Sequence, residues 1–134
     1  MKRPAVLCLD DEAILLLAIT MSLRNTLGKE VHVDAASSAA EAFKAIGELA
    51  ARDIEVQVVV CDLLMPGVRG DEFLRSLHAK LPAVKAILLT GLSDSPEELA
   101  LKNDVGLFAS LPKPCSNSEL SRVVKRALDS YQGR

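Results

Sequence analysis

Short apolar runs alternate with longer amphipathic segments along the chain. The short runs are rich in β-branched residues, Leu and Cys, as buried strands are, whereas the longer segments carry apolar residues at helical spacing. The expected strands are 5–9, 31–33 with its neighbours, 56–61, 84–89 and 107–111. The expected helices are 12–27, one capped by Ser37 or Ser38, 71–80, 95 to about 103, and one capped by Ser116 or Ser118. This alternation predicts βαβ units around a parallel sheet, with five strands and five helices.

Several residues mark where these elements end or how they are buried. Gly28 ends the first expected helix and Pro82 stops the third. The segment 95–98, Ser-Pro-Glu-Glu, is typical of an N-cap followed by a first-turn proline and two acids that favour the helix dipole. The run 56–61 is almost continuously apolar, which predicts a strand buried on both faces at the centre of the sheet.

Length and charge narrow the class of protein. The 134 residues suit a single domain, so we expect one domain over 1–134 with no output domain in this chain. The net charge of -2, from 16 basic and 18 acidic residues, lacks the positive excess that binding to nucleic acid requires. The longest apolar stretch, 13–23, is too short to cross a bilayer, and the first residues do not resemble a signal peptide. We therefore expect a cytoplasmic protein without direct nucleic-acid binding or membrane insertion.

The three cysteines do not predict a disulfide framework or a zinc site, because they are odd in number and unevenly spaced. Cys8 and Cys61 lie in apolar runs and are expected to be small buried hydrophobes. Cys115 is either a reactive thiol or a loop residue that packs under the last helix.

Polar groups follow four of the five apolar runs. They are Asp10-Asp11-Glu12, Asp62, Thr90-Gly91 and Lys113-Pro114. In a parallel sheet these strand ends meet at one edge, where open α/β sheets bind ligands. Clustered carboxylates repel one another unless a cation lies among them, and hard oxygen ligands suit Mg²⁺ or Mn²⁺. With the Thr90 hydroxyl and the Lys113 ammonium, the set predicts a divalent-cation and phosphoryl site.

Each of these motifs also has a simpler interpretation. The acids at 10–12 are placed to favour the start of the first helix, Thr90-Gly91 is an ordinary turn signal, and a lysine before a proline is common at surfaces. Asp62 is harder to explain in this way, because a carboxylate directly after a buried strand is costly without a partner.

The motifs resemble those of the receiver domain of two-component response regulators. The resemblance rests on Leu9-Asp10-Asp11-Glu12, Val60-Cys61-Asp62-Leu63-Leu64-Met65-Pro66-Gly67 with Gly70, Leu89-Thr90-Gly91 and Lys113-Pro114, and it covers essentially the whole chain. It implies a flavodoxin-like, doubly wound sheet of five parallel strands in the order 2-1-3-4-5, with five helices.

The resemblance also implies the roles of the site residues. Asp62 would accept a phosphoryl group from a phosphohistidine of a sensor histidine kinase or histidine phosphotransfer protein, and Thr90 and Lys113 would bind its oxygens. The metal site, for Mg²⁺ or Mn²⁺, would comprise Asp11 as a direct ligand, Asp10 acting through water and the lysine, Asp62, and the backbone carbonyl of Leu64. The Lys113-Pro114 peptide would be cis.

The function implied is a phosphorylation-driven switch of a phosphorelay. The protein would phosphorylate itself from its donor and lose the group slowly, and it would not be a dedicated enzyme. Its output would be a change in the surface formed by the fourth helix, fifth strand and fifth helix.

One position departs from the family pattern. Receivers usually carry Tyr or Phe three residues before the lysine, and here that residue is Ser110. Phe108, two residues earlier, is expected on the same face of the strand, where it would take over part of the role. We therefore expect a muted or relocated structural response to phosphorylation.

The first expected helix is apolar almost all round. It is either covered on every side, or it presents a docking surface to the helical bundle of a kinase or phosphotransfer partner, or it forms a homodimer contact.

Two other functions remain open. A Mg²⁺-dependent aspartyl phosphatase or phosphotransferase needs similar groups, but it typically carries a second acid two residues after the nucleophile, where this chain has Leu64. A receiver-like interaction module that has lost its chemistry is favoured only by Ser110.

Overall fold

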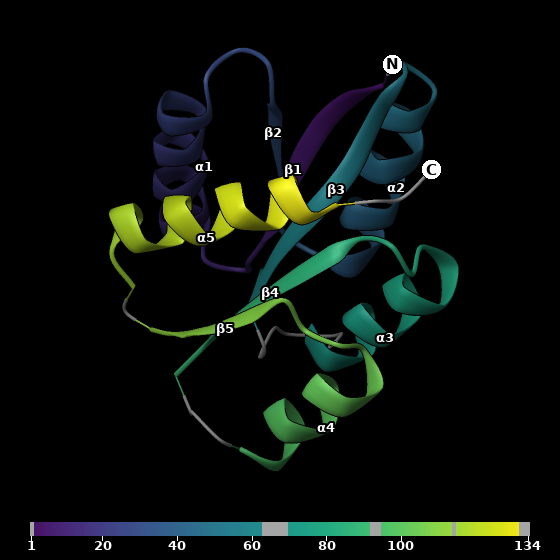
Figure 1. Cartoon of the computed structure of the whole chain (residues 1–134), viewed down its shortest axis with the longest axis vertical. Coiled ribbons are helices and arrows are strands. Elements are labelled where there is room, and N and C mark those ends of the chain that lie inside the picture. Colours follow the sequence, from purple (N-terminus) through teal and green to yellow (C-terminus); the bar gives the residue numbers. More distant parts are fainter. Residues whose placement is uncertain (1, 63–69, 92–94, 114, 132–134) are drawn as a thin grey trace.

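The computed structural model describes residues 2–62, 70–91, 95–113 and 115–131. Its centre is a sheet of five parallel strands in the order β2-β1-β3-β4-β5 (Figure 1). The strands are β1 (Arg3–Leu9), β2 (His32–Ala36), β3 (Ile54–Asp62), β4 (Lys85–Thr90) and β5 (Ala109–Pro112). The helices are α1 (Ala13–Leu27), α2 (Ala39–Ala50), α3 (Gly70–Lys80), α4 (Pro96–Asp104) and α5 (Asn117–Ser130). The predicted flavodoxin-like, doubly wound fold is confirmed.

Two apolar layers cover the sheet, one on each face. The first layer contains buried side chains of α2, α3 and α4, and the second contains those of α1 and α5. Figure 1 shows how these helices are arranged around the sheet. β3 lies in the middle, and its side chains alternate between the layers: Val59 belongs to the first, and Val58 and Val60 to the second. All three are almost completely buried, which confirms the prediction of a central strand covered on both sides.

Serine hydroxyls begin three of the helices. Ser38, Ser95 and Ser116 each accept a hydrogen bond from the backbone N–H three residues on, and each thereby satisfies a donor that the helix leaves free. Of the two pairs of candidates, the caps are thus Ser38 and Ser116. The first helix ends as predicted at Gly28, whose φ of 76° favours glycine.

Several strand ends differ from the sequence prediction by one to three residues: β1 and β3 begin two residues earlier than predicted, and β2 and β5 also differ. β2 extends to Ala36, beyond the predicted apolar core of 31–33. β5 begins only at Ala109, two residues later than predicted. Both strands lie at an edge of the sheet, so they have a partner strand on one side only and a weaker apolar pattern.

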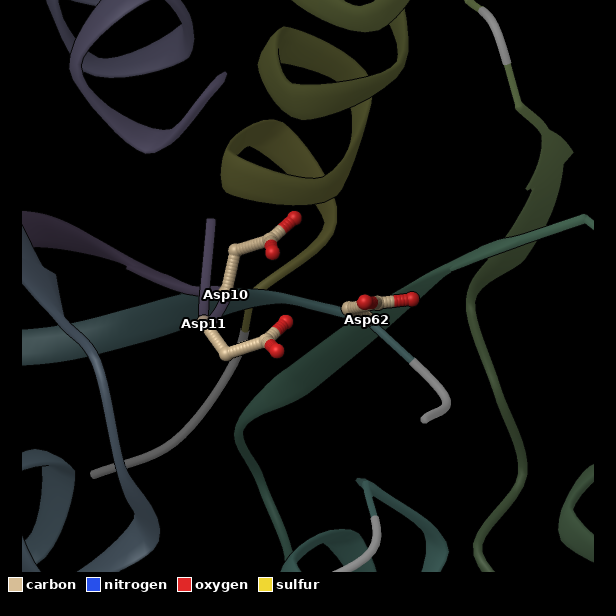
Figure 2. A group of neighbouring side chains, drawn as sticks. All are labelled: Asp10, Asp11 and Asp62. Carbon is tan, nitrogen blue, oxygen red and sulfur yellow. The ribbon is translucent and has the colours of Figure 1, made fainter. Parts of the chain in front are cut away.

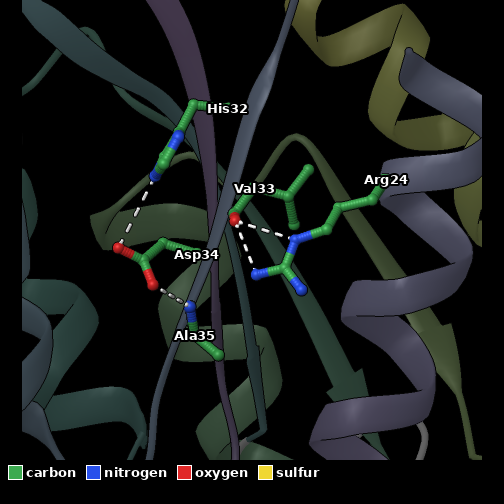
Figure 3. A network of polar contacts seen from close by, with 5 residues as sticks. All are labelled: Arg24, His32, Val33, Asp34 and Ala35. Atoms are coloured by element: carbon green, nitrogen blue, oxygen red, sulfur yellow. Dashed lines mark hydrogen bonds and ion pairs between the residues drawn. The ribbon is translucent and has the colours of Figure 1, made fainter. Parts of the chain in front are cut away.

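Polar contacts tie the edge strand β2 to α1 (Figure 3). The guanidinium of Arg24 donates from Nε and Nη2 to the carbonyl oxygen of Val33, at 3.3 and 3.0 Å. On β2 itself, Asp34 accepts from the N–H of Ala35 at 2.8 Å and lies 3.7 Å from His32 Nε2. The arginine therefore satisfies a carbonyl on the edge strand and holds the last turn of α1 against it.

Among the described residues, no helix is both long and apolar enough to span a bilayer.

The two sides of α1 differ in what they contribute to stability, which a pair of alanine variants can measure. Leu23→Ala should lower the free energy of unfolding by about 2–5 kcal/mol, because this side chain is fully buried between α1 and the sheet. Met21→Ala, on the same helix but more than half exposed, should change it by less than about 0.5 kcal/mol. Urea denaturation of both variants tests this, and equal losses would contradict the assignment of faces.

Candidate functional site

The predicted polar residues meet at the carboxyl edge of the sheet. Asp10 directly follows β1, Asp62 ends β3, Thr90 ends β4 and Lys113 directly follows β5. β1 and β3 are neighbours in register, with Leu9 opposite Cys61, and this places the aspartates that follow side by side. Figure 2 shows Asp10, Asp11 and Asp62 grouped at these strand ends. The βαβ topology therefore assembles one site from residues far apart in sequence.

The three aspartates form a cluster that suits a divalent cation. One carboxylate oxygen from each of Asp10, Asp11 and Asp62 lies within 4.8 Å of the others. Asp10 is 3% exposed and Asp62 is 8% exposed, whereas Asp11 faces solvent. A pair of buried carboxylates with a third at the rim matches the hard oxygen ligands and remaining waters that Mg²⁺ or Mn²⁺ prefers.

Asp10 shows most directly that the site can accept a cation. Its Oδ1 accepts a hydrogen bond from the N–H of Glu12 at 2.9 Å, but its buried Oδ2 has no hydrogen-bond partner among the described residues. Burial raises the pKa of Asp10 above its usual value, although the hydrogen bond from Glu12 and the charge of Lys113 partly oppose this. A buried carboxylate oxygen without a hydrogen bond, on a residue clustered with two other aspartates, is available to coordinate a divalent cation.

Lys113 supplies the positive charge that the cluster needs. Its Nζ lies 3.2 Å from Oδ2 of Asp62 and 3.6 Å from Oδ2 of Asp10. Burial alone would lower the pKa of Lys113, but the neighbouring carboxylates, Asp62 foremost, outweigh burial and raise it. The ammonium therefore stays charged at neutral pH, where it can also hold an anionic ligand as a point charge.

The backbone joins the last two strand ends. The N–H of Lys113 donates to the carbonyl oxygen of Thr90 at 2.8 Å, so the chain after β5 is fixed beside the end of β4. Thr90 itself is buried. The structure thus brings together Asp10, Asp11, Asp62, Thr90 and Lys113. Leu64 and the Lys113-Pro114 peptide lie outside the described residues.

Comparison with known proteins places this site in a family. The model of the response regulator receiver domain family matches residues 6–125. The chain belongs to this family. It is therefore a receiver, and members of this family are typically regulatory switches with a phosphoacceptor role.

Relatives and solved structures agree with this membership. The hydrogenase transcriptional regulatory protein HoxA of Cupriavidus necator is 33% identical over 96% of this chain, which spans 25% of that protein. Sensor kinase CckA of Brucella abortus is 33% identical over 92% of the chain, which spans 12% of that protein. A response regulator receiver domain protein from Clostridium thermocellum has a TM-score of 0.78 and 30% identity, over 94% of each chain. The chain thus spans a quarter or less of these two curated relatives.

The position of Ser110 in this receiver corrects one expectation. The Ser110 hydroxyl faces α4, where it donates to the Glu98 carboxylate. Phe108 instead packs into the layer of α1 and α5, together with Ala109 and Leu111. β5 begins at Ala109, so Phe108 lies before the strand. The alternation of faces along a strand, which predicted that Phe108 and Ser110 share a face, therefore does not apply to Phe108. The prediction that Phe108 shares a face with Ser110 is therefore wrong, and the reason for giving Phe108 part of the aromatic role is lost.

Glu98 is the residue of this region that the sequence prediction missed. It was expected only as a first-turn acid of its helix, yet it is 3% exposed. A signal was available, because Glu98 lies three residues before Leu101, the buried apolar residue of α4, and so shares its inward face.

The cysteines take no visible part in the chemistry. Burial raises the pKa of Cys8 to about 12 and raises that of Cys61 further above its usual value. Cys115 is half-buried beside α5, and burial together with Glu119 raises its pKa to about 11. These thiols stay protonated at neutral pH, and so Cys115 lacks the lowered pKa that a reactive thiol requires.

Replacing Asp10 tests how strained the site is in the absence of a divalent cation. A carboxyl group with a raised pKa in the folded protein contributes stability below its unfolded pKa and loses it as pH rises. Asp10→Asn, measured with a chelator at pH 7, should therefore raise the free energy of unfolding by about 0.5–2 kcal/mol. The amide oxygen can still accept from Glu12, and the gain should shrink on acidification.

Asp11→Asn is the matched control, because its side chain faces solvent and should leave stability nearly unchanged. A loss of stability in Asp10→Asn under the same conditions would contradict the electrostatic account.

Proposed function

We propose that this receiver is a phosphorylation-driven switch whose acceptor is Asp62. The donor would be a phosphohistidine of a sensor histidine kinase or histidine phosphotransfer protein. The observation that carries this proposal is the position of the Asp62 carboxylate, which lies at the carboxyl edge of the sheet, 3.2 Å from the Lys113 ammonium and within the aspartate cluster. Membership of the receiver family supports the same assignment.

Asp10, Asp11 and Asp62 are the residues that would hold Mg²⁺, and the oxygen set would also accept Mn²⁺. By resemblance to the family, the backbone carbonyl of Leu64 would be a further ligand. When bound, the cation neutralises the negative charge that accumulates between the carboxylates and the phosphoryl oxygens.

The residues of the chain carry the transfer itself. An Asp62 carboxylate oxygen attacks phosphorus, the new O–P bond forms an acyl phosphate, and the P–N bond to the donor imidazole breaks with its electron pair left on nitrogen. Lys113 is placed to move from its carboxylate partners to a phosphoryl oxygen, and the Thr90 hydroxyl is proposed to donate to another. Slow attack of water on the same phosphorus would break the Asp62 O–P bond, release inorganic phosphate and return the free carboxylate.

The acyl phosphate replaces the single negative charge of the Asp62 carboxylate with the nearly two charges of the phosphoryl group, so the edge of the sheet gains about one negative charge. Thr90 and Lys113 come from the ends of β4 and β5, so their movement toward the phosphoryl oxygens would be transmitted to the α4–β5–α5 surface. We propose this surface as the output of the switch.

An apolar ridge on α1 offers a docking site for the donor. Ile14, Leu17 and Met21 are 86%, 57% and 53% exposed, and their spacing places them along one side of the helix. Leu16 and Leu23 are buried on the other side. α1 is therefore not covered all round.

The position of α1 indicates what covers this ridge. Because the helix begins directly after the aspartates of the site, a helical phosphodonor that reaches Asp62 would cover the ridge. A second copy of the chain is the alternative occupant.

Intact mass after incubation with Mg²⁺ and acetyl phosphate tests the acceptor. The wild-type protein should gain one phosphoryl group, and Asp62→Asn should gain none. A chelator should abolish the gain, and Asp11→Asn should slow it at least about tenfold through loss of a metal ligand. Phosphorylation of Asp62→Asn would overturn the assignment. A wild-type protein that stays unmodified even with a competent histidine kinase would favour the interaction module without chemistry.

Replacing Leu17 tests the ridge. Leu17→Ala should slow phosphotransfer from the cognate phosphohistidine domain by about tenfold, because an exposed apolar anchor of the contact is lost. The rate with acetyl phosphate should not change, since a small donor does not touch α1. Leu99→Ala, which shortens an exposed leucine on α4, is the control and should leave both rates unchanged. Equal effects of Leu17→Ala and Leu99→Ala on phosphotransfer would show that the ridge is not part of the docking surface.

A further inference from the structure

A buried carboxylate lies between α4 and β5, away from the aspartate cluster. Glu98 of α4 accepts a hydrogen bond at its Oε1 from the Ser110 hydroxyl of β5, and the two oxygens are 2.9 Å apart. Lys102, one turn further along α4, places its Nζ 3.9 Å from the same oxygen. Nothing in the aspartate site requires an acid here, so the contact needs an explanation of its own.

Because Glu98 is buried, its hydrogen bond with Ser110 stabilises the packing of α4 against β5. A carboxylate that leaves water must regain its lost hydrogen bonds within the protein, and a bond to a charged acceptor is stronger than one between neutral groups. Lys102 belongs to the same helix as Glu98 and is nearly half exposed, so its contact does not join α4 to the sheet. The hydroxyl of Ser110 does, because it comes from β5.

The position of Ser110 connects the contact to the phosphorylation site. Ser110 pairs in register with Leu88, two residues before Thr90, and lies three residues before Lys113. The chain after β5 is tied to the end of β4 through the hydrogen bond from Lys113 to the Thr90 carbonyl. Whatever fixes α4 on β5 therefore also restrains the two strand ends that carry Thr90 and Lys113.

Ser110 also occupies the place where receivers usually carry an aromatic ring. A serine cannot fill that volume, and here the side chain of Glu98 enters from α4 and meets the hydroxyl. The link between helix and strand is then a directional hydrogen bond to a charge, whereas a ring at this position would act through its volume.

We propose that Glu98 and Ser110 form a polar latch that holds α4 against β5 and thereby sets how readily the site is phosphorylated. The latch is the pair of these two residues joined by their hydrogen bond. This inference rests on the proposed function. The latch stabilises the conformation described above relative to one in which Thr90 and α4 have moved. Opening the latch therefore shifts the population toward the conformation that phosphorylation favours.

Ser110→Ala tests the latch with the smallest possible change. The variant should accept phosphoryl groups from acetyl phosphate and Mg²⁺ about fivefold faster than wild type, because only the hydroxyl that closes the latch is lost. Ser110→Thr keeps a hydroxyl and should restore the wild-type rate. Ser118→Ala, which removes an exposed hydroxyl from the first turn of α5, should leave the rate unchanged.

Glu98→Met tests the other half, since it removes the acceptor while keeping the length of the side chain in the buried position. It should speed phosphorylation as much as Ser110→Ala does, and the double variant should be no faster than either single variant. Hydrogen exchange of the α4 amides, measured without donor, should be about fivefold faster in Ser110→Ala and unchanged in α2.

The outcomes separate the latch from the proposed function. Unmodified wild-type protein, even with a competent kinase, would defeat the proposed function and the latch together. Phosphorylation of wild type and Ser110→Ala at equal rates would overturn the latch alone. Unchanged exchange of α4 in Ser110→Ala, or additive effects of the two substitutions, would do the same.

Discussion

The site depends on one ammonium group held between buried carboxylates. Asp10 directly follows β1, Asp62 ends the neighbouring strand β3, and both are buried. Two negative charges so close together would drive the strand ends apart or force one carboxyl group to bind a proton. Lys113, 3.2 Å from one carboxylate and 3.6 Å from the other, makes the arrangement tolerable. It does so only in part, because the pKa of Asp10 remains raised.

This incomplete balance suits the proposed chemistry. A site that already neutralised all its carboxylates would have little affinity for a divalent cation, and one without Lys113 would repel a phosphoryl group. Lys113 directly follows β5, the edge strand, and its backbone N–H donates to the carbonyl of Thr90. This hydrogen bond fixes the backbone from which the ammonium reaches the carboxylates. The rigid layers beneath the site hold these groups in place while the charges at its surface change.

The sequence predicted the architecture because its periodicities are strong. The run at β3 is apolar on both faces, and a serine or a glycine marks several helix boundaries, so the order of elements and the convergence of Asp10, Asp62, Thr90 and Lys113 could be derived before the structure. Side-chain direction was harder to predict. Leu16 and Leu17 are equivalent by composition, and only packing on the sheet shows that the first is buried and the second is exposed. The same limit explains Phe108, whose face depends on where β5 begins.

Glu98 shows why a buried polar group is the hardest feature to derive from sequence. Its place near the start of α4 is that of an ordinary dipole-favouring acid, and its carboxylate accepts a hydrogen bond from Ser110, twelve residues later in the chain. A hydrogen bond weakens steeply when its partners turn or separate, whereas apolar contact weakens gradually. A helix held to its neighbouring strand by such a bond is therefore either docked or released over a small movement. Under the proposed function, that steepness would let a movement of Thr90 on phosphorylation release α4 as a unit.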